Sequence, residues 1–105
     1  MTESEFAIAS GELLNQIEEA IDTADLDIDY ERKGDGVLDI EFADRSRVIV
    51  NTQAPMRQIW VAAKSGGFHF EYAGGGWRDT RSGEGLTVLL ARVMSQQAGV
   101  AVDLG

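Results

Sequence analysis

The sequence predicts an α+β fold, a two-layer α-β sandwich in which an N-terminal and a C-terminal helix pack on one face of a roughly six-stranded antiparallel sheet. Three observations predict this fold. Apolar residues recur at helical spacing near both ends, they alternate with polar residues in between, and tight turns separate the alternating segments. Because successive hairpins give antiparallel pairs, we expect the helices to cover one face of the sheet. At this length, residues 1–105 are expected to form a single domain.

The first helix is expected to begin after Thr2 and to run to about Ala24. Thr2 and Glu5 match the S/T-x-x-E capping box, which satisfies two free backbone amides at the start of a helix. Gly11 costs about 1 kcal/mol relative to alanine, too little to interrupt the helix. The apolar residues that recur at helical spacing are Phe6, Leu13, Leu14, Ile17, Ala20, Ile21 and Ala24.

From Leu26 onward the apolar spacing changes to a period of two, which is typical of strands. In the segment 26–31 every second residue is apolar and the residues between are all acidic, so this strand has one apolar and one acidic face. The turn at 34–36 leads to a second strand, Val37–Phe42, with a similar alternation. The remaining strands are expected at 45–51, 57–63, 68–72 and 77–80.

The second helix is expected to be capped by Ser82, with Glu84 in its first turn, where the helix dipole favours an acid. Gly99 is placed to end this helix. Leu86, Leu89, Leu90, Val93 and Gln97 are expected to lie along one face of this helix.

Charge is distributed very unevenly along the chain. Residues 1–44 hold 14 of the 18 acidic residues and two of the nine basic ones, a net charge of −12, whereas the rest of the chain carries +3. The overall charge of −9 argues against binding to nucleic acid and against docking on an anionic membrane. The absence of cysteine excludes disulfides and thiolate sites. The acidic start is unlike a signal peptide and no apolar run could span a bilayer, so we expect a cytoplasmic protein.

The acidic residues concentrate in the segment 18–31, which contains seven carboxylates and no lysine or arginine. If the first helix and first strand are consecutive, these side chains can merge into one ridge along the corner between them. Like charges at such spacings repel, and acids near a helix C-terminus oppose its dipole by about 0.3–1 kcal/mol. Such uncompensated costs point to a functional site. The candidate metal-binding residues are Glu18, Glu19, Asp22, Asp25, Asp27, Asp29 and Glu31.

Carboxylate ligands suit hard cations such as Ca²⁺, Mg²⁺, Mn²⁺ and iron. The run Asp25-x-Asp27-x-Asp29 begins like an EF-hand loop, but Tyr30 occupies the place of the required glycine. Carboxylates spaced along a strand cannot enclose one ion, so we expect several open, water-rich and exchangeable sites. Such sites suit the delivery or sensing of a metal better than catalysis.

Three other interpretations of the acidic segment stay open. It could be a solvated surface that serves solubility. It could be a docking surface for arginine and lysine side chains of a partner, with incidental metal binding. It could also belong to a ferroxidase, but such an enzyme needs paired carboxylates, usually supported by a Glu-x-x-His motif on helices. The only histidine, His69, is expected on a strand, so we predict no catalytic residues and no enzyme activity.

Trp60 shares one face of its predicted strand with Gln58 and Ala62. If the opposite face packs on the helices, Trp60 stands exposed on an open sheet, where a tryptophan is a good anchor for a protein partner. The alternative is that Trp60 is the buried side chain. His69 is interpreted as a polar-face residue, with a metal ligand or proton shuttle as the alternative.

The run Val50–Tyr72 resembles the frataxin signature, in particular Asn51-x-Gln53-x-Pro55 followed by Gln58-Ile59-Trp60. Ser4-Glu5-Phe6, the acidic segment 18–31, Trp77 and the run Arg81-Ser82-Gly83-Glu84 look like the bacterial branch of that family, the CyaY proteins. The resemblance extends from about Ser4 to Leu104. One departure is Thr23, where bacterial relatives often carry another acid, and it bears on the number of iron sites.

This resemblance implies a frataxin-like sandwich and an iron-binding protein of iron–sulfur cluster assembly. The seven acids listed above would bind Fe²⁺ and Fe³⁺ weakly, and other hard divalent cations would compete. The ridge would also dock on the cysteine desulfurase, so that the protein presents iron to, or regulates, the complex of desulfurase and scaffold protein. Trp60, Asn51 and Gln58 would contact this complex. The expected state is a monomer, with iron-dependent oligomers as the alternative.

Overall fold

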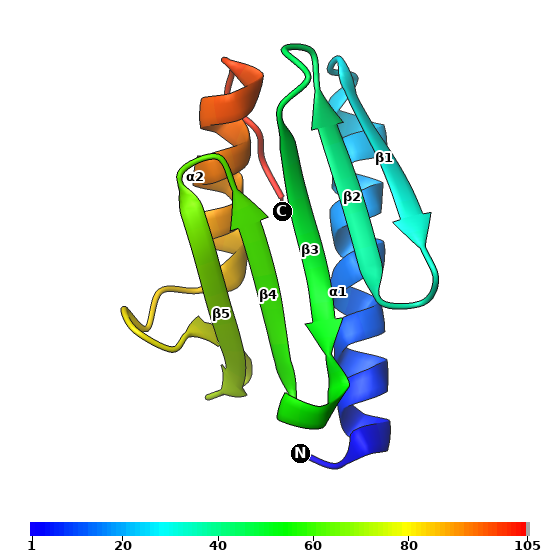
Figure 1. Cartoon of the computed structure of the whole chain (residues 1–105), viewed down its shortest axis with the longest axis vertical. Helices are drawn as coiled ribbons and strands as arrows, with labels where there is room; N and C mark the ends of the chain where they lie inside the picture. The colour runs from blue at the N-terminus through cyan, green and yellow to red at the C-terminus, as the bar shows by residue number, and fades with distance from the viewer. Residues whose placement is uncertain (105) are drawn as a thin grey trace.

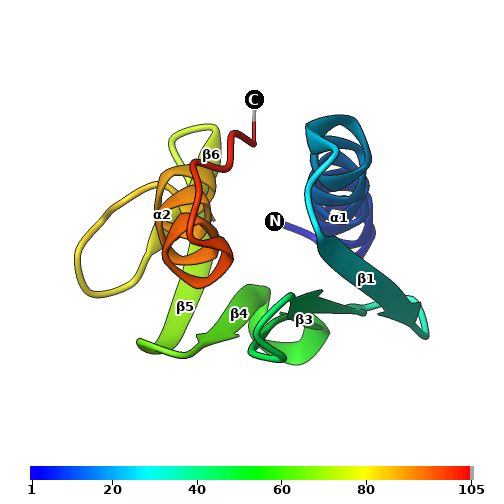
Figure 2. The same ribbon diagram turned by 90° about the horizontal axis from the view of Figure 1, so that it is seen from above.

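The computed structural model describes residues 1–104, and its six strands form one antiparallel sheet in the order β1-β2-β3-β4-β5-β6. Both helices lie on the same side of this sheet, α1 toward β1 and α2 toward β5 (Figures 1 and 2). The predicted fold class is therefore confirmed. The elements are α1 (Glu3–Ala24), β1 (Ile28–Lys33), β2 (Val37–Phe42), β3 (Arg47–Gln53), the 3-10 helix η1 (Ala54–Met56), β4 (Gln58–Ala63), β5 (Gly66–Ala73), β6 (Gly76–Asp79) and α2 (Leu86–Ala98).

The core lies between the two helices and the sheet face that they cover, here called the inner face. Alternate strand residues such as Ile40, Val50 and Ile59 are fully buried there. They meet the apolar stripes of the helices, including Leu14 and Leu90, which are also fully buried. Burial of this apolar surface is the main term that stabilises the sandwich. The opposite, uncovered side is called the outer face below.

The start of α1 has the predicted capping box. The Thr2 hydroxyl accepts the Glu5 amide at 3.1 Å, and the Glu5 carboxylate accepts the Thr2 amide at 2.7 Å. Near the same end of the sandwich, Trp77 of β6 meets Phe6 edge-on, with ring centroids 5.7 Å apart. The N-terminal turn is therefore fixed both by backbone hydrogen bonds and by core packing.

Two strands begin two residues later than predicted. The first begins at Ile28 rather than Leu26, because Asp25 ends α1 in the left-handed region (φ 53°) and the chain bends through Leu26 and Asp27. The third begins at Arg47, because the hairpin turn places Arg45 at φ 74°. This turn is closed by a hydrogen bond of 2.9 Å from the Phe42 amide to the Ser46 carbonyl.

Smaller differences affect the other strands. The strand predicted from Arg57 begins at Gln58, since Arg57 also has a positive φ of 54°. The strand β5 extends beyond the predicted 68–72 at both ends, and β6 ends at Asp79 rather than at Thr80.

The prediction that Ser82 caps the second helix is wrong. The helix begins at Leu86 with Gly85 as its N-cap, and no side chain caps it. The buried Asp79 carboxylate instead accepts the backbone amides of Arg81 and Ser82, which holds the residues after β6 in a loop. Glu84 lies in this loop and pairs with Arg92 of α2. Gly99 ends the helix at φ 75°, as predicted.

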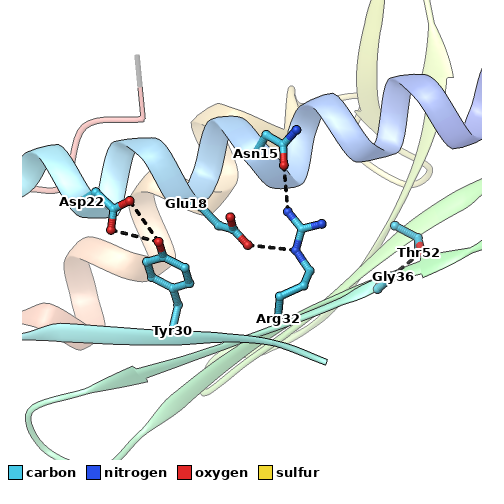
Figure 3. A network of polar contacts seen from close by, with 7 residues as sticks. All are labelled: Asn15, Glu18, Asp22, Tyr30, Arg32, Gly36 and Thr52. Atoms are coloured by element: carbon cyan, nitrogen blue, oxygen red, sulfur yellow. Dashed lines mark hydrogen bonds and ion pairs between the residues drawn. The ribbon is translucent and has the colours of Figure 1, made fainter. Parts of the chain in front are cut away.

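Gly36 has a specific steric role at the end of the β2–β3 ladder. The amide and hydroxyl of Thr52 both donate to the Gly36 carbonyl, at 2.8 and 3.1 Å (Figure 3). A Cβ atom on Gly36 would lie 2.3 Å from the Thr52 hydroxyl oxygen, so a larger residue would displace this hydroxyl from its hydrogen bond.

Within residues 1–104, neither helix has the length and apolar character needed to cross a membrane.

Candidate functional site

A polar seam joins the last turns of α1 to the edge strand β1 (Figure 3). Glu18 and Asp22, one helical turn apart, face Arg32 and Tyr30, which are two residues apart on β1. The separation of the two acids along the helix matches that of their two partners along the strand, since four helical residues rise about 6.0 Å and two strand residues about 6.8 Å. Sequence reasoning placed these two acids on the ridge but did not identify their partners on β1.

Each of these two acids has a close partner. The Arg32 guanidinium donates from Nε to a Glu18 carboxylate oxygen at 2.8 Å and from Nη2 to the Asn15 side-chain oxygen at 3.0 Å. The Tyr30 hydroxyl lies 2.9 Å from both carboxylate oxygens of Asp22. This hydrogen bond raises the pKa of Tyr30 above its ordinary value, because it favours the protonated phenol beside a carboxylate.

The other five acids lie in three different surroundings. Glu19 lines a hollow of about 550 Å³ between α1 and the C-terminal segment, away from the seam. Asp25 and Asp27 are exposed in the connection between α1 and β1. Asp29 and Glu31 are exposed on the outer face of β1. Their side chains have no hydrogen bond or ion pair to other described residues.

The outer face contributes two further acids that sequence reasoning did not place in the site, Asp39 and Glu41 of β2. The register sets Asp29 opposite Glu41 and Glu31 opposite Asp39. A hollow of about 230 Å³ is lined by all four of these carboxylates and by Arg47, which pairs with Asp39 and Glu41. The polar alternation in segment 37–42 was visible in the sequence, but the cross-strand register that joins it to β1 was not.

Asp39 differs from its neighbours because it is buried, with 6% of its surface exposed. One carboxylate oxygen accepts Lys33 Nζ at 3.0 Å and Arg47 Nη1 at 2.8 Å. The other oxygen is buried without a hydrogen-bond partner in the described chain. Burial by itself would raise the pKa of Asp39, but the hydrogen bonds from Lys33 and Arg47 outweigh it and hold this pKa below its ordinary value.

The acidic segment therefore presents several separate groups of carboxylates rather than one continuous row. Among residues 1–104, no group of three or more Asp, Glu or His side chains is arranged to hold a metal ion. The exposed acids of this segment are placed to contact a hydrated cation, or basic side chains of another protein, through one or two carboxylates at a time.

The second candidate surface centres on Trp60 on the outer face of β4. Its inward-facing neighbours Ile59 and Val61 are buried, so the expectation that Trp60 points away from the helices is confirmed. It is partly buried rather than fully exposed, because its ring stacks on that of His69, with centroids 4.4 Å apart and planes at 10°. Asn51 lies opposite Trp60 on β3.

Hydrogen bonds fix the orientation of the indole ring. Trp60 Nε1 donates to the Gln58 side-chain oxygen at 2.8 Å, and the Gln58 amide nitrogen donates to Glu71 at 3.0 Å. His69 is exposed, in agreement with its interpretation as a polar-face residue. The three predicted protein-binding residues, Asn51, Gln58 and Trp60, are thus adjacent on one face of the sheet.

The sequence matches the family model of the frataxin-like domain over residues 1–100. It is 49% identical to a protein of Cupriavidus metallidurans named iron-sulfur cluster assembly protein CyaY, in an alignment that covers 99% of this chain and 96% of that protein.

Solved structures show the same fold. A frataxin from Psychromonas ingrahamii superposes with a TM-score of 0.93 at 33% identity, covering 100% of this chain and 99% of that one. A trimeric frataxin from the yeast Saccharomyces cerevisiae, complexed with ferrous iron, gives a TM-score of 0.68 at 28% identity, covering 94% of this chain and 88% of the yeast chain.

Proposed function

The chain belongs to the frataxin-like family, and from this premise we propose that it is a non-enzymatic, iron-binding protein of iron–sulfur cluster assembly. Its ridge presents iron to the complex of cysteine desulfurase and scaffold protein, or regulates that complex. The name of the Cupriavidus relative supports the assembly role, and the ferrous complex of the yeast frataxin supports iron as the cargo. The trimeric state of yeast frataxin supports oligomers as an alternative to a monomer, and we propose that their formation depends on iron.

The observation that carries the proposal is the set of ridge carboxylates that make no hydrogen bond or ion pair to the side chain of another described residue. These are Glu19, Asp25, Asp27, Asp29 and Glu31. Unpaired negative charges this dense attract cations, and carboxylate oxygens are ligands that hard cations prefer. Because one or two carboxylates contact an ion at a time, the ion keeps most of its water and exchanges readily. Such open sites suit transfer of iron to a second protein.

The Trp60 face supports a separate contact with the assembly complex. An aromatic ring held by stacking and by a hydrogen bond loses little conformational freedom when a partner covers it. Partly exposed tryptophans of this kind are frequent anchors of protein interfaces. We assign Trp60 and Asn51 to the contact with the desulfurase–scaffold complex, and the buried Gln58 contributes to it by holding the indole ring in place.

A second candidate function is a docking module whose acids meet basic side chains of the desulfurase, with metal binding incidental. The observation that favours it is that no three carboxylates of the described chain converge on one point. The two functions differ in their response to a chelator. Desulfurase binding that is unchanged by a chelator favours the docking module, whereas binding that needs added Fe²⁺ favours iron presentation.

The test of the iron-binding function is an anaerobic ¹⁵N-HSQC titration with Fe²⁺, with Ca²⁺ in parallel. The variant D27N/D29N/E31Q removes three unpartnered acids of the ridge. The control variant E3Q/E12Q/D35N removes three exposed acids elsewhere and changes the net charge by the same amount. We expect Fe²⁺ to broaden the signals of residues 18–31 in the wild type and in the control, and Ca²⁺ to act much more weakly.

The ridge variant should lose most of this response. Equal responses to both ions would mean that the ridge binds cations without selectivity, and this result would favour the docking module. A response that the ridge variant and the control variant retain equally would reject the assignment of iron to these acids.

A further inference from the structure

Arg32 is the one basic residue on the strand face that meets the acidic part of α1. Its guanidinium reaches across from β1 and lies between Glu18 and Asn15 (Figure 3). The pair is partly shielded from solvent, since 27% of the Arg32 side chain and 24% of the Glu18 side chain are exposed. Partial burial limits screening by water and salt, so the charge of Arg32 acts on its surroundings more strongly than that of an exposed arginine.

We propose that Arg32 is an internal counter-ion of the ridge, which occupies Glu18 and so sets the affinity of this surface for divalent cations. This inference rests on the proposed iron-binding function. The guanidinium occupies one Glu18 carboxylate oxygen, so a cation can bind both oxygens of Glu18 only after the guanidinium has moved away, and a cation at the other oxygen lies close to the positive charge. A cation that binds at the neighbouring acids is also repelled by the fixed positive charge.

The neighbouring contact with Tyr30 has a different consequence. A neutral phenol hydrogen-bonds to Asp22 without cancelling its charge, so Asp22 still attracts cations while it is held in place. Arg32 instead cancels one of the seven ridge charges. On the seam, Asp22 is therefore oriented but keeps its charge, whereas the charge of Glu18 is neutralised.

The experiment compares two variants that each remove one arginine charge. R32Q removes the counter-ion, and R81Q is the matched control, because Arg81 is exposed in the loop between β6 and α2. Fe²⁺ affinity is measured anaerobically at about 10 mM ionic strength, where the Debye length is about 30 Å. We expect R32Q to bind Fe²⁺ about five- to tenfold more tightly than the wild type, and R81Q to differ from it less than about twofold.

The double variant E18Q/R32Q distinguishes two causes of tighter Fe²⁺ binding in R32Q. One is that Glu18 becomes available as a ligand, and the other is that the positive charge of Arg32 is lost. If Glu18 becomes a ligand in R32Q, most of the gain should disappear in the double variant. A gain in R32Q no larger than that in R81Q would overturn the inference. If the NMR signals of residues 18–31 in the wild type do not respond to Fe²⁺, the proposed iron binding itself is rejected, and the counter-ion role with it.

A second measurement uses the wild-type protein and does not depend on how the variants fold. The Arg32 side-chain Nε–H resonance is followed by NMR while Ca²⁺, which is diamagnetic, is added to saturation. Displacement from Glu18 should shift this resonance and speed its exchange with water, while the Arg92 Nε–H resonance stays unchanged as the internal control. An Arg32 resonance that is unaffected at saturation would overturn the inference.

Discussion

Most acids of the segment 18–31, at the α1–β1 edge, differ in their surroundings from a set of carboxylates elsewhere in the molecule that have close partners. Outside the segment 18–31, Asp39 is paired with Lys33 and Arg47, Glu84 with Arg92, and Asp79 with the backbone amides of its loop. Within the segment, five of the seven acids make no hydrogen bond or ion pair to another side chain of residues 1–104, and the other two depend on a single arginine and a single tyrosine.

This difference separates acids that hold the fold together from acids that are free for another task. Asp39 connects β1, β2 and β3 from a buried position, and its partners compensate the cost of burying a charge. The five ridge acids other than Glu18 and Asp22 make no such connection, and Asp25 ends a helix whose last turn contains no basic residue. Removing a paired acid should therefore cost stability, whereas removing one of these five ridge acids should cost none.

The largest effect is expected from D39N. It should lower the free energy of unfolding at pH 7 by about 1–2 kcal/mol, since Lys33 and Arg47 lose a charged acceptor. The pKa of Asp39 is lowered in the folded state, so its contribution is present above the unfolded pKa of about 4 and is lost as the pH falls through the folded value. The free energies of unfolding of the wild type and the variant, measured with urea, should therefore converge at low pH.

The matched control for this prediction is D29N, the same substitution on the same face of the sheet at an acid without a partner. We expect it to leave the urea midpoint unchanged or slightly raised. A loss of stability as large as that of D39N would contradict the distinction between paired and free acids.

An effect of opposite sign is expected from D25G. Asp25 ends α1 in the left-handed region, which glycine adopts without steric cost, and its charge opposes the helix dipole. The variant should raise the free energy of unfolding by about 0.5–1 kcal/mol. Urea unfolding checks this, and D25N separates the two causes because it removes only the charge. A lower stability of D25G would show that the Asp25 carboxylate supports the fold.

The smallest effect is expected from E84Q. Glu84 pairs with Arg92, which lowers the pKa of Glu84, but half of the Arg92 side chain is exposed, so water and salt screen the pair. The melting temperature should fall by less than about 2 °C in low salt and by still less in 1 M NaCl. Thermal unfolding followed by circular dichroism at both salt concentrations measures this, and a fall above about 5 °C would show a stronger structural role for the pair.

Much of this fold could be predicted from local patterns. The capping box at Thr2, the strand Val37–Phe42 and the helix end at Gly99 were found where the sequence indicated, because each depends on residues close together in the chain. The start of α2 was predicted wrongly, although its cause is equally local. Asp79, three residues before Ser82, accepts the loop amides, and this pattern prevails over capping by Ser82, so the helix begins at Leu86.

The candidate site divides in the same manner. The concentration of acids in segment 18–31, the likeness to frataxins and the alternation that places Trp60 opposite the core-facing residues all follow from the order of the amino acids. The order of the amino acids does not tell which acids lack a partner. Arg32 meets Glu18 only when β1 folds back along α1, and Asp39 meets Arg47 only through the β2–β3 pairing. Electrostatic and hydrogen-bond energies depend on distances through space, and those distances are set by strand register and helix packing.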